Sequence, residues 1–314
     1  MEYGLLGRTG LNVSRLCFGS LTISPLQANL PLHEGANVIR TALSAGVNFI
    51  DTADLYDNYS YIGEAIKDFP DVIVASKSYD YTYNGMRLSV EKACRETGRD
   101  YVDIFMLHEQ VSRLTLRGHR EALNFLADAK AQGVVRAVGV STHTVEVVQA
   151  AALMDEIDVI HPILNIRGVG ILDGSVYDML VAVKNAAAAG KGVYTMKALG
   201  GGHLIGEAQA ALHWILAQEG VNAVAVGMQS TAEVAVNTAI FSGSLPDAAM
   251  AAVIGKQKRR LLVEEWCIGC GSCAAKCPMG ALTIIENKAV PDTKRCVLCG
   301  YCGAYCPEFC IKII

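Results

Sequence analysis

Apolar residues along the chain fall into short runs, and each run is followed by a segment whose alanines and leucines have helical spacing. Eight of these strand-like runs begin near Val13, Val47, Asp71, Val102, Val134, Asp158, Gly192 and Val221. Several runs are continuously apolar, which is typical of strands buried on both faces of a parallel sheet. Eight alternating strand and helix units predict an α/β fold, a closed (β/α)8 TIM barrel of about 250 residues.

The first residues of the chain predict a β-hairpin ahead of the barrel. Residues 3–6 and 11–16 are strand-like, and the Gly7-Arg8-Thr9-Gly10 segment between them has the composition of a turn. We expect this hairpin to close the bottom of the barrel.

Composition changes after the eighth unit, where small and turn-forming residues run from Ser242 to Asp247. Asp247 is suited to cap a following helix, and the basic residues at 258–260 suit the negative end of that helix. The sequence therefore predicts three parts. They are a barrel over 1–241, a linker and connecting helix over 242–260, and a C-terminal domain over 261–314.

Composition and charge narrow the class of protein. The 314 residues are 52% hydrophobic and 18% charged, which supports a sizeable core and excludes a disordered chain. The net charge is -4, whereas nucleic acids and anionic membranes are bound by clustered positive charge. No stretch of 18 residues lacks a polar interruption, and the first residues do not have the pattern of a secretory signal. We expect a cytoplasmic protein with neither nucleic acid nor membrane as a partner.

The cysteines are concentrated near the C-terminal end. Nine of the eleven follow residue 266, and eight of these form two copies of the spacing C-x2-C-x2-C-x3-C-P, displaced by 29 positions. In this spacing three thiolates hold one iron–sulfur cube and the fourth crosses to the other cube. The predicted ligands are Cys267, Cys270, Cys273 and Cys306 for one 4Fe-4S cluster, and Cys296, Cys299, Cys302 and Cys277 for the second. Zinc also binds four cysteines, but the three-fold C-x2-C run is not zinc spacing.

The tail resembles the bacterial two-cluster ferredoxins over its whole length, which implies a small α+β domain. Cys310 corresponds to Ala281 of the other copy, so we expect it to pack beside a cluster rather than to be a ligand. Cys17 and Cys94, in the barrel part, are expected to be buried thiols.

Three of the apolar strands end in ionisable residues. Asp51 follows the second strand, Lys77 the third and His108 the fourth, while Tyr56 lies in the loop after Asp51. Side chains at the carboxyl ends of the strands of such a barrel face the active-site mouth. A buried Asp51–Lys77 ion pair with a hydrogen-bonded histidine is the structural alternative.

These residue types suit the reduction of a carbonyl group. A tyrosine is a weak acid at neutral pH, but a nearby ammonium such as that of Lys77 lowers its pKa. Asp51 would hold Lys77 charged, and His108 would orient a substrate oxygen. A carbonyl that accepts a hydride needs a proton donor and stabilisation of the developing oxyanion.

The chain also resembles the aldo-keto reductases, from its first residue to about residue 241. The resemblance is carried by residues 4–11, 46–56 and 103–108, and the whole chain is similar to the ferredoxin-fused branch of that family. This resemblance implies NAD(P)H-dependent reduction of a carbonyl or the reverse oxidation of an alcohol. It also implies that the family's catalytic tetrad is Asp51, Tyr56, Lys77 and His108, with Tyr56 as general acid and base.

The expected nucleotide site departs from the family pattern. The candidate residues are Ser141, His161, Met196, Lys197, Gly227, Gln229, Ser230 and Asn237. Thr142 and His161 stand where asparagine and glutamine are common, and Lys197 has no usual counterpart. We expect the helix after Gly227 to end near Asn237, and backbone N–H groups at its start are suited to a pyrophosphate.

The charge of this segment favours NADH over NADPH. There is no Lys or Arg from Ala198 to Gly255, whereas a 2'-phosphate is usually met by cations. Glu233 would repel that phosphate. A different or degraded nucleotide site is the alternative.

Two functions from different classes remain open. The first is an oxidoreductase acting on a small carbonyl or alcohol, which Arg167 and Lys197 suggest is anionic. The second is an electron-transfer protein in which the barrel is a docking scaffold. Hydride transfer moves two electrons together, whereas each cluster accepts one. Three roles of the clusters therefore stay open: a relay of electrons to a separate redox partner, a radical or stepwise reduction in the barrel, and a structural role.

Overall fold

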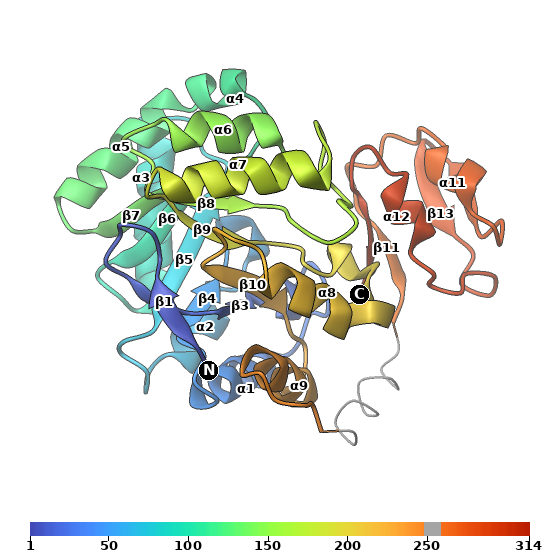
Figure 1. Cartoon of the computed structure of the whole chain (residues 1–314), viewed down its shortest axis with the longest axis horizontal. Helices are drawn as coiled ribbons and strands as arrows, with labels where there is room; N and C mark the ends of the chain where they lie inside the picture. The colour runs from blue at the N-terminus through green and yellow to red at the C-terminus, as the bar shows by residue number, and fades with distance from the viewer. Residues whose placement is uncertain (248–258) are drawn as a thin grey trace.

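Eight parallel strands close into a barrel in the computed structural model, which describes residues 1–247 and 259–314 (Figure 1). Each strand pairs with its neighbours in chain order, and β10 closes the ring against β3. The strands are β3 (Leu16–Gly19), β4 (Phe49–Asp51), β5 (Ile73–Ser78), β6 (Val102–Gln110), β7 (Val135–Thr142), β8 (Val159–Pro162), β9 (Gly192–Thr195) and β10 (Ala223–Gly227). This confirms the predicted (β/α)8 barrel.

Helices surround the barrel and cover its apolar strands (Figure 1). They are α1 (Leu32–Ser44), α2 (Tyr59–Ala65), α3 (Tyr83–Thr97), α4 (Arg113–Gly118), α5 (Arg120–Ala131), α6 (Val145–Ala152), α7 (Val176–Ala188), α8 (Ala208–Leu216) and α9 (Thr231–Phe241). Hydroxyl side chains cap several of them: Ser175, for example, forms a capping box with Asp178 at the start of α7. Short 3-10 turns lie in the loops: η1 (Ser20–Ile23), η2 (Asp54–Tyr56), η3 (Gly200–Gly202) and η4 (Ile205–Glu207).

The predicted hairpin precedes the barrel. β1 (Tyr3–Leu5) pairs antiparallel with β2 (Asn12–Ser14), and Leu6, Leu11 and Val13 are buried in the same cluster as the side chains of the barrel interior. The turn passes so close to β9 that a Cβ on Gly7, which has φ 54°, would lie 2.2 Å from the backbone nitrogen of Gly192. The hairpin therefore closes one end of the barrel, and the opposite end is left for a site.

Two boundaries differ from the sequence prediction. The apolar run at Val13 belongs to the hairpin, and the first barrel strand begins three residues later at Leu16. The Ser14 nitrogen donates to the side chain of Asn48, and pairing with the barrel strand β10 begins only at Leu16. The last barrel helix was expected to end near Asn237 but continues to Phe241, because Ile240 and Phe241 still pack into the core.

The C-terminal part is a small α+β unit. β11 (Leu261–Val263) pairs antiparallel with β14 (Ile311–Ile313), and β12 (Leu282–Ile285) pairs with β13 (Lys288–Pro291). Two short helices, α11 (Ser272–Lys276) and α12 (Tyr301–Ala304), lie within the two cysteine runs and carry Cys273 and Cys302. This agrees with the predicted ferredoxin-like architecture. The predicted connecting helix over 247–260 lies almost entirely outside the described residues.

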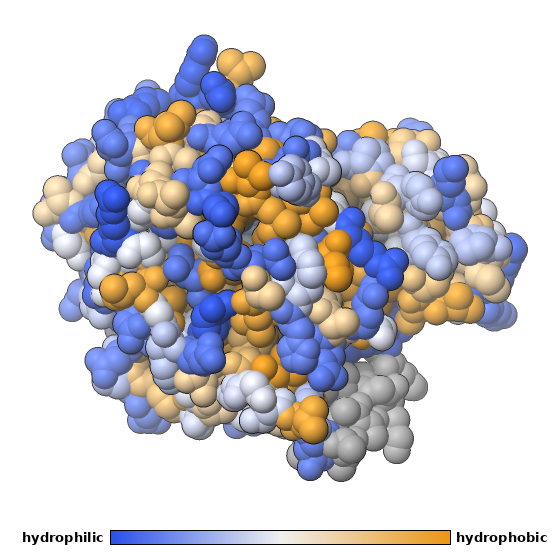
Figure 2. Space-filling view, in the orientation of Figure 1, coloured by the Kyte–Doolittle hydropathy of each residue, from blue (hydrophilic) through white to orange (hydrophobic). Residues whose placement is uncertain are grey.

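The tail packs against the barrel through β14, which contacts η3. The His203 ring hydrogen-bonds through Nε2 to the Ile311 carbonyl oxygen at 2.8 Å. A Cβ on Gly202 would lie 2.0 Å from the Ile313 oxygen, so only glycine allows this approach. On the face shown in Figure 2, apolar and hydrophilic residues are interspersed over both lobes. None of the helices in the described ranges has the length and apolar character needed to cross a bilayer.

Candidate functional site

A cavity of about 1920 Å³ opens at the carboxyl ends of the barrel strands and extends to the tail. It exceeds the roughly 300–1,000 Å³ of an ordinary small-molecule pocket, so it has room for a dinucleotide and a second ligand. Asp51, Tyr56 and His108 line it, together with Phe309 and Lys312 of the tail. The strand-end position of these residues agrees with the general location of active sites in barrels of this kind.

A buried ion pair lies at the base of the cavity. Asp51 ends β4 and Lys77 lies in the adjacent β5, so the parallel register brings them together. The Lys77 ammonium donates to both Asp51 carboxylate oxygens, at 2.8 and 2.9 Å, and to the Thr52 carbonyl at 2.8 Å. Lys77 is only 1% exposed. The ammonium is therefore held in one position.

Tyr56 and His108 lie above this pair. The Lys77 Nζ is 5.0 Å from the centroid of the Tyr56 ring, and the Tyr56 and His108 ring centroids are 6.0 Å apart in an edge-to-face arrangement. His108 is buried, and its Nδ1 has no hydrogen-bond partner within the described ranges. Burial, and then the charge of Lys77, hold the pKa of His108 well below its usual value. His108 is thus neutral.

The pKa of Tyr56 differs from the sequence expectation. Burial raises it well above 10, and the charges of Asp51 and Glu109 raise it further. The expected lowering by Lys77 was therefore wrong. The reason is that Asp51 engages the ammonium with both oxygens and offsets much of its field. Tyr56 consequently keeps its proton at neutral pH.

Two aromatic residues beside Asp51 complete the base of the site. The Tyr194 hydroxyl donates to Asp51 Oδ2 at 2.9 Å, and the Tyr194 ring stacks on His161 with centroids 3.9 Å apart. The His161 Nε2 lies 3.6 Å from the same Asp51 oxygen. Burial is the main cause that lowers the pKa of His161 to about 4.

The depressed pKa of His161 makes stability depend on pH. As pH falls from about 6.5 to about 4, the unfolded chain binds a proton at His161 that the folded chain does not. Folding stability is therefore lost over this window, by about 2 kcal/mol between pH 7 and pH 5 from this residue alone. We expect a His161→Gln variant to lose that much less stability than the wild type when urea unfolding is measured at the two pH values. Equal losses in the two proteins would contradict this assignment.

A polar chain runs from His108 across the mouth of the barrel. Tyr79 stacks on His108 with centroids 4.2 Å apart, and its hydroxyl donates to Glu109 Oε2 at 2.7 Å. Glu109 Oε1 lies 3.1 Å from Nδ1 of His143. The Nε2 of that ring lies 2.8 Å from the Lys197 ammonium, which donates to it. Lys197 is therefore fixed within the site and is not a solvated lysine at its rim.

The sequence prediction missed four of these residues. Tyr79 and His143 directly follow β5 and β7, and Glu109 follows His108, so the strand-end rule that selected the tetrad also applied to them. Tyr194 lies inside a continuous apolar strand. It had no signal of its own.

The predicted nucleotide residues are mostly gathered along the same cavity. Those that line it are Ser141, His161, Met196, Lys197, Gly227, Gln229 and Asn237. The Ser141 hydroxyl accepts a hydrogen bond from the Glu109 nitrogen at 2.8 Å, so its oxygen is oriented by the backbone. Ser230 is not among the lining residues, since its hydroxyl caps α9 by accepting from the Glu233 nitrogen.

The charges around α9 differ from the expectation in one respect. The Glu233 carboxylate forms an ion pair with Arg259 at 3.2 Å and also accepts from the Gln229 nitrogen at 2.6 Å. A cation thus reaches this end of the cavity from beyond the Lys- and Arg-free segment. Arg167, expected to attract an anionic substrate, instead forms an exposed ion pair with Glu207 at 2.7 Å.

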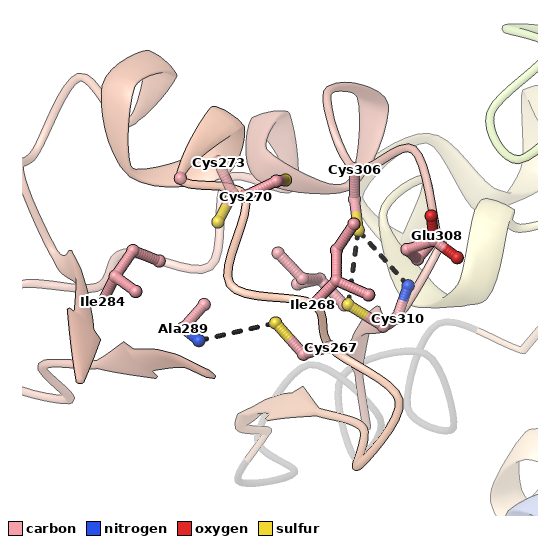
Figure 3. A pocket seen from close by; sticks show the side chains of 11 residues that line it. Cys267, Ile268, Cys270, Cys273, Ile284, Ala289, Cys306, Glu308 and Cys310 are labelled. Carbon is pink, nitrogen blue, oxygen red and sulfur yellow. Dashed lines mark hydrogen bonds between the residues drawn. The ribbon is translucent and has the colours of Figure 1, made fainter. Parts of the chain in front are cut away.

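One predicted set of cysteines surrounds a small pocket in the tail (Figure 3). The pocket is lined by Cys267, Cys270, Cys273, Cys306 and Cys310. Backbone nitrogens donate to two of these sulfurs, from Ala289 to Cys267 at 3.5 Å and from Cys310 to Cys306 at 3.4 Å. The Cys310 and Cys306 sulfurs are 3.3 Å apart. Such N–H donors suit thiolates that hold a cluster.

Three cysteines of the second predicted set, Cys277, Cys296 and Cys302, belong to the same hydrophobic core of the tail as three of the first set. Burial, and then the charges of Cys273, Cys296 and Cys299, raise the pKa of Cys302 to about 12. The Cys277 sulfur accepts a hydrogen bond from the Ala281 nitrogen at 3.3 Å. No trio of His, Cys, Asp or Glu in the described ranges is arranged around the position of a single metal ion. In the barrel, Cys17 is buried as expected and Cys94 is half-buried.

Comparison with known proteins gives two family matches. The model of the aldo/keto reductase family matches residues 15–207, and that of a 4Fe-4S dicluster domain matches residues 261–307. An L-galactose dehydrogenase from Arabidopsis thaliana is 23% identical over 76% of this chain and 88% of its own. A 6-dehydroglucose reductase from Novosphingobium aromaticivorans is 30% identical over 47% of this chain, which spans only 53% of that relative.

Solved structures agree with the fold. A Pseudomonas aeruginosa protein assigned to the aldo-keto reductases has a TM-score of 0.67 at 26% identity, over 77% of this chain and 95% of that one. An aldo-keto reductase from Bacillus halodurans, in its holo form, has a TM-score of 0.66 at 22% identity, over 82% and 96%. The chain therefore belongs to the aldo/keto reductase family and is an oxidoreductase that carries a 4Fe-4S dicluster domain at its C-terminal end.

Proposed function

We propose that the protein catalyses reversible hydride transfer between NAD(P)H and a small aldehyde or ketone. The observation that carries this proposal is the arrangement of Asp51, Lys77, Tyr56 and His108 beside one cavity. The nicotinamide, when bound, supplies the hydride. What the chain itself must supply is a proton and a site for the negative charge that develops on the carbonyl oxygen.

Each member of the tetrad has a part in this chemistry. Tyr56 donates its hydroxyl proton to the carbonyl oxygen, and the nearby ammonium of Lys77 stabilises the phenolate that remains. Asp51 keeps Lys77 charged and fixed. Neutral His108 can donate a hydrogen bond to the same substrate oxygen and orient it. In alcohol oxidation the proton returns along the same path.

We propose that the nucleotide lies along β10 and the start of α9, with NADH preferred. Gly227, Gln229 and Asn237 line the cavity there, and the start of a helix suits a pyrophosphate. The Arg259 guanidinium is neutralised by Glu233, so it offers a 2'-phosphate less charge than an unpaired cation would.

A Glu233→Gln variant tests this preference. It removes the negative charge beside Arg259 but keeps an oxygen for the Gln229 nitrogen. We expect NADPH affinity to rise about tenfold relative to NADH, which is the scale of one charge-assisted hydrogen bond. Dissociation constants from nucleotide fluorescence measure the ratio. An unchanged ratio would place the adenosine end of the nucleotide elsewhere.

We propose that the tail holds two 4Fe-4S clusters. Cys267, Cys270, Cys273 and Cys306 would hold the first, and Cys296, Cys299, Cys302 and Cys277 the second. The pocket that the first set lines and the N–H donors to its sulfurs support this ligand set. When bound, each cluster supplies a one-electron redox centre. Because hydride moves two electrons together, we assign the clusters to exchange with a separate redox partner.

Iron analysis tests the ligand sets. A chain with two such clusters contains about eight iron atoms, and we expect Cys306→Ala to lower this to about four. Cys310→Ala should leave the iron content unchanged, although its sulfur lies 3.3 Å from that of Cys306. Cys94→Ala, in the barrel, is the matched control. Full iron content in Cys306→Ala, or zinc in place of iron, would overturn the assignment.

The proposed division of labour is a catalytic barrel over 1–241, a connection over 242–260 and an electron-transfer domain over 261–314. Its test is an anaerobic titration of the cluster-loaded protein with NADH and with NADPH, followed by nucleotide fluorescence and cluster absorption. Saturable binding supports chemistry in the barrel. If neither nucleotide binds, the alternative of an electron-transfer protein with a scaffold barrel is the better description.

A further inference from the structure

Two lysines from different parts of the chain meet at the mouth of the barrel. Lys197 follows β9, and Lys312 lies in β14 of the tail. Their ammonium nitrogens are 4.8 and 3.3 Å from the centroid of the Phe309 ring. Both lysines line the cavity that Tyr56 and His108 also line. The tail therefore contributes a cation to the same space as the tetrad.

Neither ammonium forms an ion pair with a carboxylate of the described residues. Lys197 donates to the His143 ring and Lys312 donates to the Phe309 carbonyl oxygen. In the ranges that the structure describes, neither nitrogen has a carboxylate within salt-bridge distance. The carboxylate of Glu109 is engaged by Tyr79 and His143 instead.

Burial makes this lack of a counter-charge costly. Lys312 is only 6% exposed, and a buried cation is unfavourable unless it is paired. Burial lowers the pKa of both lysines, and the charge of Lys197 lowers that of Lys312 further. On Lys312, the charges of Glu264, Glu109 and Cys306 act in the opposite direction but do not offset this lowering. A ligand with a negative charge would relieve this conflict.

Both lysines are held in place by their surroundings. Lys197 has φ 57°, a left-handed conformation that costs a residue with a side chain about 1 kcal/mol or more. Lys312 is positioned by β14, which is anchored to the barrel where His203 meets the Ile311 carbonyl. On the barrel side, a Cβ on Gly201 would lie 2.9 Å from Cδ of Lys312, so a side chain at this position would displace the lysine.

We infer that Lys197 and Lys312 together bind a carboxylate of the substrate, so that the substrate is an aldehyde or ketone that also carries a carboxylate. This inference rests on the proposed hydride transfer. A nucleotide phosphate is a second source of negative charge. The residues proposed to hold the pyrophosphate, however, belong to β10 and the start of α9, whereas the Lys197 ammonium contacts His143 at the end of β7. Lys197, which the sequence placed among the nucleotide candidates, is therefore reassigned to the substrate. Lys312 then makes the tail part of the substrate site.

The first test measures binding without turnover. Benzoate and neutral benzamide serve as probes in calorimetric titrations of the cluster-loaded full chain. We expect wild type to bind benzoate more tightly than benzamide, and Lys312→Met and Lys197→Met each to weaken benzoate binding about tenfold or more. Lys294→Met, which removes an exposed lysine of the tail, should have no effect. Equal benzoate affinity in wild type and both variants would overturn the inference.

The second test asks whether the lysines bind a substrate carboxylate or a nucleotide phosphate, and whether the proposed hydride transfer occurs. NADH and NADPH affinities should stay within about twofold of wild type in both variants, and a specific loss of nucleotide binding would assign the lysines to a phosphate instead. With 4-carboxybenzaldehyde and its neutral amide as substrates, the ratio of kcat/KM for the acid to that for the amide should fall about tenfold in each variant.

Turnover with no preference for the carboxylate leaves the proposed function standing and overturns this inference. Benzoate binding that depends on the lysines, without any turnover, supports the anion site and overturns the proposed function. Iron content and the unfolding midpoint show that Lys312→Met is folded, and Lys197→Met tests the site from the barrel alone.

Discussion

Replacing Tyr56 by phenylalanine should lower kcat for carbonyl reduction by about 10²- to 10⁴-fold, which is the contribution of a positioned general acid. The substitution removes only the hydroxyl group and keeps the ring that lies 6.0 Å from His108 and 5.0 Å from the Lys77 ammonium. Because the pKa of Tyr56 is raised by burial, its proton is present across the neutral range. The loss should therefore appear at every pH between 6 and 9.

The controls separate lost chemistry from lost structure. Nucleotide affinity and iron content should be unchanged in Tyr56→Phe, because neither depends on the hydroxyl. Tyr81→Phe is a matched variant, since Tyr81 is 63% exposed and does not line the cavity; it should retain full turnover. A Tyr56→Phe enzyme with wild-type kcat would exclude Tyr56 as the acid, and His108 would then be the next residue to test.

The tetrad could be predicted because it depends on local pattern and on one rule of topology. Asp51, Lys77 and His108 each end an apolar run, and a parallel barrel places the ends of neighbouring strands on one edge. The pairing of Asp51 with Lys77 follows from the adjacency of β4 and β5. The repeat of the cysteine spacing likewise predicted a two-cluster tail without reference to its neighbours.

The rest of the site depends on contacts between segments far apart in the chain. The sequence predicts Tyr194 as a core residue. Only the structure shows that its hydroxyl donates to Asp51, which lies 143 positions away in the chain. Lys312 enters the cavity because the tail packs on η3, and nothing in the local sequence near Lys312 indicates that packing. Arg259 reaches Glu233 for the same kind of reason. The pKa of Tyr56 was predicted with the wrong sign because burial was not visible in the sequence.

The ion pair below Tyr56 gives the second large effect, on stability as well as on rate. We expect Lys77→Met to lower the free energy of unfolding by about 3–5 kcal/mol, the usual cost of leaving a buried charge without its partner. Asp51 is 5% exposed. Without the ammonium it would keep only the Tyr194 hydroxyl at 2.9 Å and the His161 nitrogen at 3.6 Å. Guanidinium unfolding followed by circular dichroism measures the loss.

The double variant Asp51→Asn with Lys77→Met shows where that cost arises. If it comes from the uncompensated carboxylate, neutralising Asp51 should restore at least about 1–2 kcal/mol relative to Lys77→Met alone, because a neutral buried pair can be as stable as an ionic one. Turnover should stay low in both, since neither retains the ammonium that stabilises the Tyr56 phenolate. A double variant that is no more stable than Lys77→Met would mean that the lysine contributes mainly through packing and through the Thr52 carbonyl. If stability recovers but turnover does not, the Asp51–Lys77 ion pair is needed for catalysis and not for the stability of the fold.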